Sequence, residues 1–289
     1  MDMFDAASRY KFKISHSNDM GLNAHVIDEC LGSLIDEAES IKPSQIDLSS
    51  FRVCHTLEPK IWVNGLMNSR VRLRLLDIAD DFVDYLNVTW CKPIDTVVTG
   101  SIANYNWSRY SDIDLHIIYD FKEVDERTEF VREYFDTKRK QWNDKHGSIN
   151  IYGHTVELYV QDINEYHVST GIYSLEENEW IVKPHKDNIE SVKLNKGIIK
   201  DKVASIASKI FELEEKSSSI KDEHEMDVLS KKVRTLFTKI RGMRKESLNR
   251  YGEWGTGNII YKALRRLGYI DRLINLRDNT YNKLRSIEK

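Results

Sequence analysis

The sequence is poor in cysteine and proline, and it has no long hydrophobic run. Its three cysteines, Cys30, Cys54 and Cys91, form no Cys-x-x-Cys pair and have no histidine cluster beside them. This argues against a zinc site or a disulfide framework and predicts buried thiols. No run approaches the ~18–20 apolar residues that span a bilayer. The first five residues include two acids where a signal peptide would carry Lys or Arg, so we expect a cytoplasmic location.

Charge of both signs is nearly balanced over the chain but unevenly distributed. The formal net charge is −3, and the hydrophobic and charged fractions, 40% and 31%, are those of an ordinary globular protein. From Val228 to Lys289 there are 16 Lys and Arg against five Asp and Glu, a local charge of +11, which leaves −14 for the first 227 residues. Such a basic segment would suit a polyanionic substrate, and the alternative is that it lines solvated helix faces.

Two predicted strands near residue 100 carry the most informative pattern. The β-branched run Thr96–Thr99 predicts a short buried strand, and Ile113–Ile118 predicts a second one. Side chains alternate between the two faces of a strand. We therefore expect Asp112 and Asp114 on one face and the apolar side chains between and after them in a core.

Two neighbouring carboxylates on one strand face repel each other unless a cation lies between them. Mg²⁺ suits this position because it binds carboxylate oxygens and leaves coordination sites for phosphate and water. The turn at Gly100-Ser101 fits the same chemistry, since glycine permits a close backbone approach. The N–H groups that open a helix at 101–103 would then hold a phosphate. The residues together predict a site for a metal-bound triphosphate.

This pattern resembles the signature of the DNA polymerase β-like nucleotidyltransferase superfamily. The resemblance rests on Thr99-Gly100-Ser101, followed after a loop by Asp112-Ile113-Asp114-Leu115. The family has a third carboxylate on a later strand, and Glu157 in the β-rich run 154–160 is the candidate. The resemblance covers 96–160. The wider likeness, which includes Trp180 and Gly257-Asn258, is to members encoded by tailed phages.

The resemblance implies a two-metal nucleotidyltransferase that moves an NMP from an NTP to an acceptor hydroxyl and releases pyrophosphate. The implied catalytic and metal-binding residues are Asp112, Asp114 and Glu157, with two Mg²⁺ or Mn²⁺ ions. The implied nucleotide-binding residues are Gly100, Ser101 and Lys262. The basic segment favours RNA as the acceptor. Nucleotidylation of a protein or a small molecule, and a regulator that binds nucleotide without turnover, remain open.

The expected fold class is α+β, with a small mixed nucleotidyltransferase-type sheet flanked by helices and an all-α C-terminal domain. The expected parts are an N-terminal helical segment (1–45), a nucleotidyltransferase catalytic domain (46–187) and a helical C-terminal domain (188–289). Apolar periodicity predicts helices over 22–41 and 68–86, the latter capped by Asn68 or Ser69, and one within 120–145. A hairpin over 149–160 and an exposed loop over 214–225 complete the prediction, and the short apolar runs 172–175 and 180–184 are expected either to add edge strands or to pack across the sheet.

Overall fold

The computed structural model describes residues 41–165, 169–186 and 194–287. They form two compact units, one within 50–186 and the other comprising 41–49 and 194–287. The first unit is a small mixed sheet with flanking helices and the second is helical, so the predicted α+β class is confirmed. The helix expected over 22–41 lies, apart from its last residue, outside the described residues. The three-part division remains a prediction.

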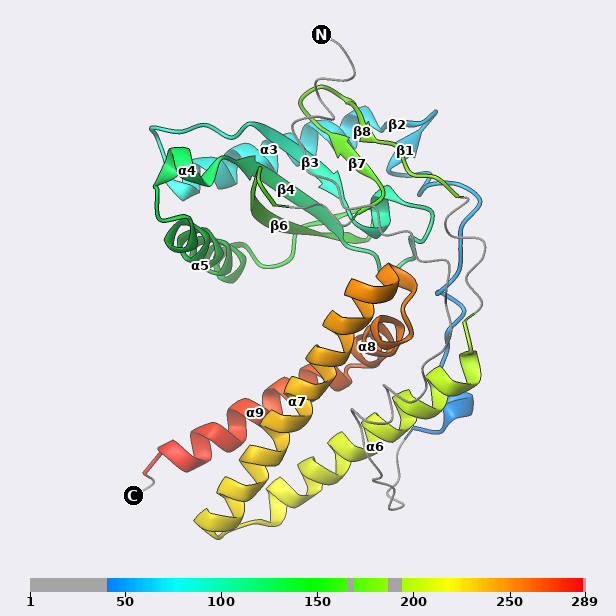
Figure 1. Ribbon diagram of the computed structural model, residues 1–289, viewed down its shortest axis with the longest axis vertical. Helices are drawn as coiled ribbons and strands as arrows, with labels where there is room; N and C mark the ends of the chain where they lie inside the picture. Colours follow the sequence, from blue (N-terminus) through cyan, green and yellow to red (C-terminus); the bar gives the residue numbers. More distant parts are fainter. Residues whose placement is uncertain (1–40, 166–168, 187–193, 288–289) are drawn as a thin grey trace. The chain divides into compact units, whose positions relative to one another are not determined.

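A six-stranded sheet forms the centre of the first unit (Figure 1), in the order β5-β6-β4-β3-β7-β8. Its strands are β3 (Asp95–Thr99), β4 (Ile113–Tyr119), β5 (Asn150–Ile151), β6 (His154–Asp162), β7 (Ile172–Ser174) and β8 (Glu179–Val182). β4 and β6 run parallel, and the other neighbours run antiparallel. The predicted strands at 96–99 and 113–118 and the hairpin are therefore confirmed. The runs near 172–175 and 180–184 both join the sheet, but of these only β8 is an edge strand, because β7 lies between β3 and β8. A separate two-stranded hairpin, β1 (Trp62–Val63) and β2 (Leu66–Met67), was not predicted.

The first unit also contains the helices α3 (Ser69–Leu86), α4 (Phe121–Val124) and α5 (Thr128–His146), and a 3₁₀ turn, η2 (Ser101–Ala103). Asn68 caps α3 by accepting a hydrogen bond from the backbone N–H of Arg70, as predicted. The charged segment that was expected to hold one helix holds two. They are separated at Asp125, whose carboxylate accepts from the backbone N–H and the guanidinium of Arg127.

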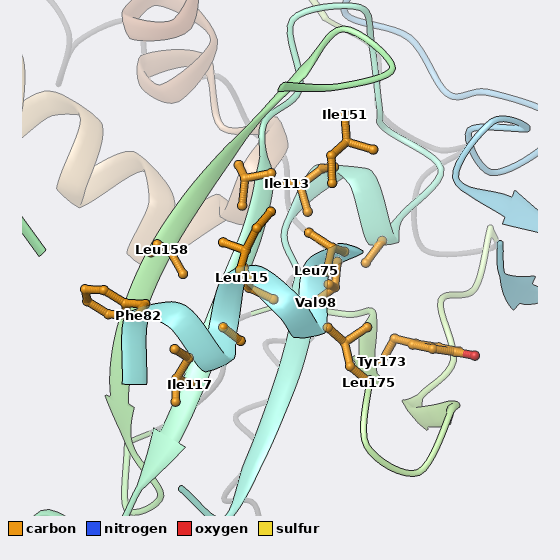
Figure 2. Close-up of a cluster of buried hydrophobic side chains, with 14 of the residues drawn as sticks. Leu75, Phe82, Val98, Ile113, Leu115, Ile117, Ile151, Leu158, Tyr173 and Leu175 are labelled. Carbon is orange, nitrogen blue, oxygen red and sulfur yellow. The ribbon is translucent and has the colours of Figure 1, made fainter. Parts of the chain in front are cut away.

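One face of the sheet carries the main core of the first unit, and α3 and α5 cover it. Its centre contains fully buried side chains of β4 and α3: Ile113, Leu115, Ile117, Leu75 and Phe82 (Figure 2). Each such side chain contributes about 1.5–3 kcal/mol on burial. Because β4 places its odd-numbered residues in this core, Asp114 and His116 lie on the opposite face, where Val97 and Ile118 belong to a smaller apolar cluster.

The second unit consists of helices. They are α6 (Lys196–Ser219), α7 (Glu223–Tyr251), α8 (Thr256–Arg266) and α9 (Tyr269–Arg285), with the short 3₁₀ turns η1 (Pro43–Gln45) and η3 (Gly252–Trp254). The predicted exposed loop over 214–225 is wrong, because α6 continues to Ser219 and α7 begins at Glu223. Glu214 pairs with Arg272 of α9, and Ser217 is buried, so these polar residues are held in the last turns of α6.

The cysteine prediction is partly correct. Cys91 is a buried free thiol. Cys54 is a free thiol but only half-buried, because it lies in a loop where its Sγ donates to the carbonyl oxygen of Trp107 at 3.4 Å. Cys30 lies outside the described residues. No helix in the described ranges is both long and apolar enough to cross a membrane.

Candidate active site

Three polar residues form a row across β3, β4 and β6. The strand register places Asp114 of β4 opposite Thr99 of β3 on one side and opposite Glu157 of β6 on the other. Cross-strand partners point to the same face, and neighbouring strands lie about 4.8 Å apart. The parallel pairing of β4 with β6 therefore brings two of the three predicted carboxylates side by side, on the face opposite the helices. Asp112 is the residue directly before β4, and it is half-buried.

The backbone of Gly100 lies against the carboxylate of Asp114. Gly100 has a φ of 72°, in the region that favours glycine. A Cβ atom at this position would come within 1.7 Å of Asp114 Oδ2. Both the backbone conformation and the close approach therefore require glycine, and the Gly-Ser turn and the Asp-x-Asp strand form one local arrangement.

Ser101 connects the two halves of the predicted motif. The helix expected at 101–103 is the single 3₁₀ turn η2. The Ser101 hydroxyl donates to Ser111 Oγ at 2.8 Å, and Ser111 Oγ also accepts from the backbone N–H of Ser108 at 3.0 Å. His154, the first residue of β6, bonds the Ser111 carbonyl oxygen through Nδ1 at 2.6 Å. The loop between β3 and β4 is thus attached to the start of β6 as well as to η2.

Glu157 has a hydrogen-bond donor that the sequence analysis did not identify. The hydroxyl of Tyr159, two residues along β6 and so on the same face, donates to Glu157 Oε2 at 2.7 Å. Burial, and then the negative charge of Glu157, raise the pKa of the Tyr159 phenol, so the hydroxyl keeps its proton. The guanidinium of Arg139 lies over the Tyr159 ring, 4.8 Å from its centroid. Strand alternation from Glu157 would have identified Tyr159.

His116 occupies the next position on this face of β4. Its ring centroid lies 4.9 Å from that of Tyr159, and its Nδ1 lies 2.6 Å from Gln161 Oε1. Burial lowers the pKa of His116, which favours the neutral imidazole with Nδ1–H donating to Gln161. His116 and Tyr159 therefore form a second, ordered row beside the carboxylates.

The donor chemistry of the site suits a divalent cation. Carboxylate oxygens are the ligands that Mg²⁺ and Mn²⁺ prefer. Over the residues that the structure describes, however, no group of three or more His, Cys, Asp or Glu side chains is placed to hold a metal ion. One Glu157 oxygen accepts from Tyr159, so a site with all three carboxylates requires side-chain rearrangement. The metal assignment of Asp112, Asp114 and Glu157 stays a prediction.

Lys262 lies on α8 in the second unit. Its ammonium pairs with the carboxylate of Glu253 in η3. The neighbouring Asn258 donates to the Glu253 carbonyl oxygen at 2.7 Å, and a Cβ on Gly257 would lie 2.9 Å from the Met243 carbonyl oxygen. The Gly257-Asn258 pair therefore packs the start of α8 closely against η3 and α7. A nucleotide contact by Lys262 stays a prediction.

Comparisons with known proteins give a structural likeness of low similarity. No family model matches the sequence, and no curated protein matches it. Among solved structures, the chain is similar to the STING-associated CdnE c-di-GMP synthase from Capnocytophaga granulosa. The identity is 12%, the match covers 76% of this chain and 84% of that chain, and the TM-score is 0.22. Similarity this low does not extend the activity of that synthase to this chain.

Proposed function

We propose that the chain transfers a nucleotide from an NTP to an acceptor hydroxyl, with release of pyrophosphate, at the carboxylates of β4 and β6. The observation that carries this proposal is the register that pairs Asp114 with Glu157, with the Gly100 backbone against the Asp114 carboxylate. Paired carboxylates beside a close glycine turn would accommodate a metal-bound triphosphate.

Each residue of the site has a proposed role. Asp114 and Glu157, together with Asp112, would hold Mg²⁺ or Mn²⁺. When bound, such ions offset phosphate charge and lower the pKa of an attacking hydroxyl. Glu157 would also accept the proton of the acceptor hydroxyl. Gly100 would leave room for the terminal phosphates, and the Ser101 hydroxyl would exchange its bond to Ser111 for a phosphate oxygen.

The acceptor is the finer part of the proposal. The +11 charge of the C-terminal segment favours RNA. A protein or a small molecule is the alternative acceptor, and binding of nucleotide without turnover is the alternative function. Retention of acids that repel one another favours turnover, since a binding-only site has less use for them.

The test is transfer of label from each of the four NTPs in the presence of Mg²⁺, with and without RNA, measured as labelled acceptor and released pyrophosphate. Asp114→Asn and Glu157→Gln keep the shape of the side chains and remove their charge. Each should lower the transfer rate by about a hundredfold or more. Such a loss requires a barrier only about 2.7 kcal/mol higher, because each tenfold change in rate corresponds to about 1.36 kcal/mol. Glu179→Gln, which alters an exposed acid on β8, is the matched control and should leave transfer unchanged.

Two outcomes would contradict the proposal. If the double variant Asp114→Asn/Glu157→Gln transfers at the wild-type rate, the reaction does not use these carboxylates. If the wild type binds NTP but releases no pyrophosphate with any acceptor class, the chain is a nucleotide-binding protein without turnover.

A further inference from the structure

The helix α7 has a long basic stretch without acids. Between Lys231 and Lys245 it carries seven Lys and Arg and no Asp or Glu. Six of these cations are exposed: Lys231, Lys232, Arg234, Lys239, Arg241 and Lys245. We call these six residues the basic track. At 1.5 Å per residue the track is about 21 Å long.

Five of the cations lie along the two sides of the track. Lys231 lies at one end of its middle, which otherwise carries small side chains. With about 100° between successive residues, Arg234 and Lys239 fall on opposite sides of the exposed face, and Thr235 and Thr238 fall between them. A surface hollow of about 430 Å³ is lined by Lys231, Arg234, Thr235, Thr238 and Lys239. At Gly242, one turn further along this face, an added Cβ would meet no other atom of the described chain within 4 Å. The middle of the track is therefore open enough to admit an extended polymer backbone.

Most of the positive charge on the track is not neutralised locally. Lys231 pairs with Asp227 at 2.6 Å, and this hydrogen bond, with a smaller effect of Arg234, lowers the pKa of Asp227. For Lys232, Lys239 and Lys245, the described residues provide no ion pair. Unpaired like charges on one helix repel each other. A polyanion that lies along the track relieves this repulsion and so lowers the free energy of the complex.

The track offers no aromatic ring for stacking. The ring of Phe237 is half-buried, and the guanidinium groups of Arg241 and Arg277 lie 5.5 and 4.7 Å from its centroid. Single-stranded nucleic acids are held by cations along the backbone and by aromatic rings under the bases. Only the first of these two contacts is present on the track. Its partner is therefore recognised by regularly spaced negative charge rather than by its bases.

We propose that the basic track binds the phosphodiester backbone of a nucleic acid, without reading its sequence. Cations on both sides would contact phosphates, and the hydroxyls of Thr235 and Thr238 would donate to phosphate oxygens in the hollow. A nucleic acid fits better than an acidic protein because its charges recur at a fixed spacing over the length of the track. The proposal goes beyond nucleotidyl transfer, because it requires neither the carboxylates nor an NTP.

The test is binding of a fluorescent, mixed-sequence RNA of about 20 nucleotides to the full chain. Chelator is present and NTP is absent, so that a failure of nucleotidyl transfer does not affect the result. Anisotropy is measured between about 50 and about 200 mM salt, with DNA of the same sequence as a second arm. The track variant is Lys231→Gln/Arg234→Gln/Lys239→Gln. The control, Lys196→Gln/Lys216→Gln/Lys221→Gln, removes the same charge from exposed positions on or next to α6.

The wild type should lose affinity steeply with salt, by a log–log slope of about −0.7 for each phosphate contact on a single strand. The track variant should bind at least tenfold more weakly at low salt, with a slope shallower by about 2, which corresponds to three contacts. The control should keep the wild-type slope. Lys231→Arg/Arg234→Lys/Lys239→Arg retains every charge and should restore binding, which separates loss of charge from loss of fold.

Three results would overturn the proposal. One is a track variant that binds RNA like the wild type. The second is an equal loss in the control, which would indicate attraction to net charge alone. The third is a poly-glutamate peptide of matched charge that binds the track as tightly as RNA, which would make the surface a docking site for an acidic protein.

Discussion

Gly100 is the position where a single added methyl group has the most direct consequence for the candidate site. Gly100→Ala would place an alanine at φ 72° and ψ −160°, a region that essentially only glycine adopts, at a cost of about 1–3 kcal/mol, and would displace the Asp114 carboxylate. Gly153→Ala is the matched control, because Gly153 has a φ of 90° and nothing within 4 Å of an added Cβ in the described chain. In urea unfolding, Gly100→Ala should be the more destabilising of the two. Equal losses would show that the glycine is needed only for its φ.

Tyr159 is expected to compete with a metal ion for one oxygen of Glu157. Tyr159→Phe removes a hydrogen bond to a charged group and should lower the free energy of unfolding by about 1.5 kcal/mol without metal. The same change frees Glu157 Oε2, so Mn²⁺ should raise the melting temperature of the variant more than that of the wild type. Tyr152→Phe, at an exposed turn position, is the control. An unchanged Mn²⁺ effect in Tyr159→Phe would mean that the tyrosine and the metal do not share this oxygen.

Among the secondary-structure elements, the turn between α6 and α7 differs most from the sequence prediction. Only 220–222 separate the two helices, and the Asp222 carboxylate accepts from the backbone N–H of Glu225 at the start of α7. Asp222→Ala should therefore lower the stability of the second unit by about 1 kcal/mol, measured by urea unfolding. Asp222→Asn keeps the capping oxygen and should lose much less. An Asp222→Ala protein as stable as the wild type would show that packing alone fixes this helix start.

The elements that the sequence predicted well are those whose side chains alternate or repeat with a clear period. β4 alternates Ile113, Leu115 and Ile117 with polar residues, and α3 has a buried stripe and an Asn cap. The serine-rich end of α6 lacks such a period. It is held by a tertiary contact instead, since Glu214 accepts a hydrogen bond from Arg272 of α9, 58 residues further along. A long-range contact of this kind leaves no local signal in the sequence.

Across the whole molecule, the composition of the candidate site was predictable and its spatial order was not. The Gly-Ser turn, Asp114 and Glu157 could be identified by residue type and spacing. The parallel pairing that aligns Asp114 with Glu157 joins residues 43 positions apart, and no turn chemistry predicts it. The Ser101–Ser111 bond likewise follows from tertiary structure, whereas the Tyr159–Glu157 bond within β6 follows from strand alternation and could have been predicted.

The division of charge is also a property of the whole chain. The carboxylate row belongs to the first unit and the basic track to the second, so the two can be altered independently. Variants in which Gln replaces the Lys and Arg of the track should leave NTP-dependent stabilisation at the carboxylates unchanged. Asp114→Asn should leave RNA binding unchanged. Cross-effects in both directions, measured by melting and by anisotropy, would contradict this independence.

Thermal melting with Mg²⁺ and an NTP is the decisive check on whether Asp114 and Glu157 form a metal–nucleotide site, because no acceptor is needed. A ligand at about a hundred times its Kd adds about 2.7 kcal/mol to the folded state. We expect a clear rise in Tm for the wild type and no rise for Asp114→Asn/Glu157→Gln. The Tm of this double variant without metal should be equal to or slightly above that of the wild type. An equal rise in both proteins would contradict this expectation, since the metal and nucleotide would then bind elsewhere.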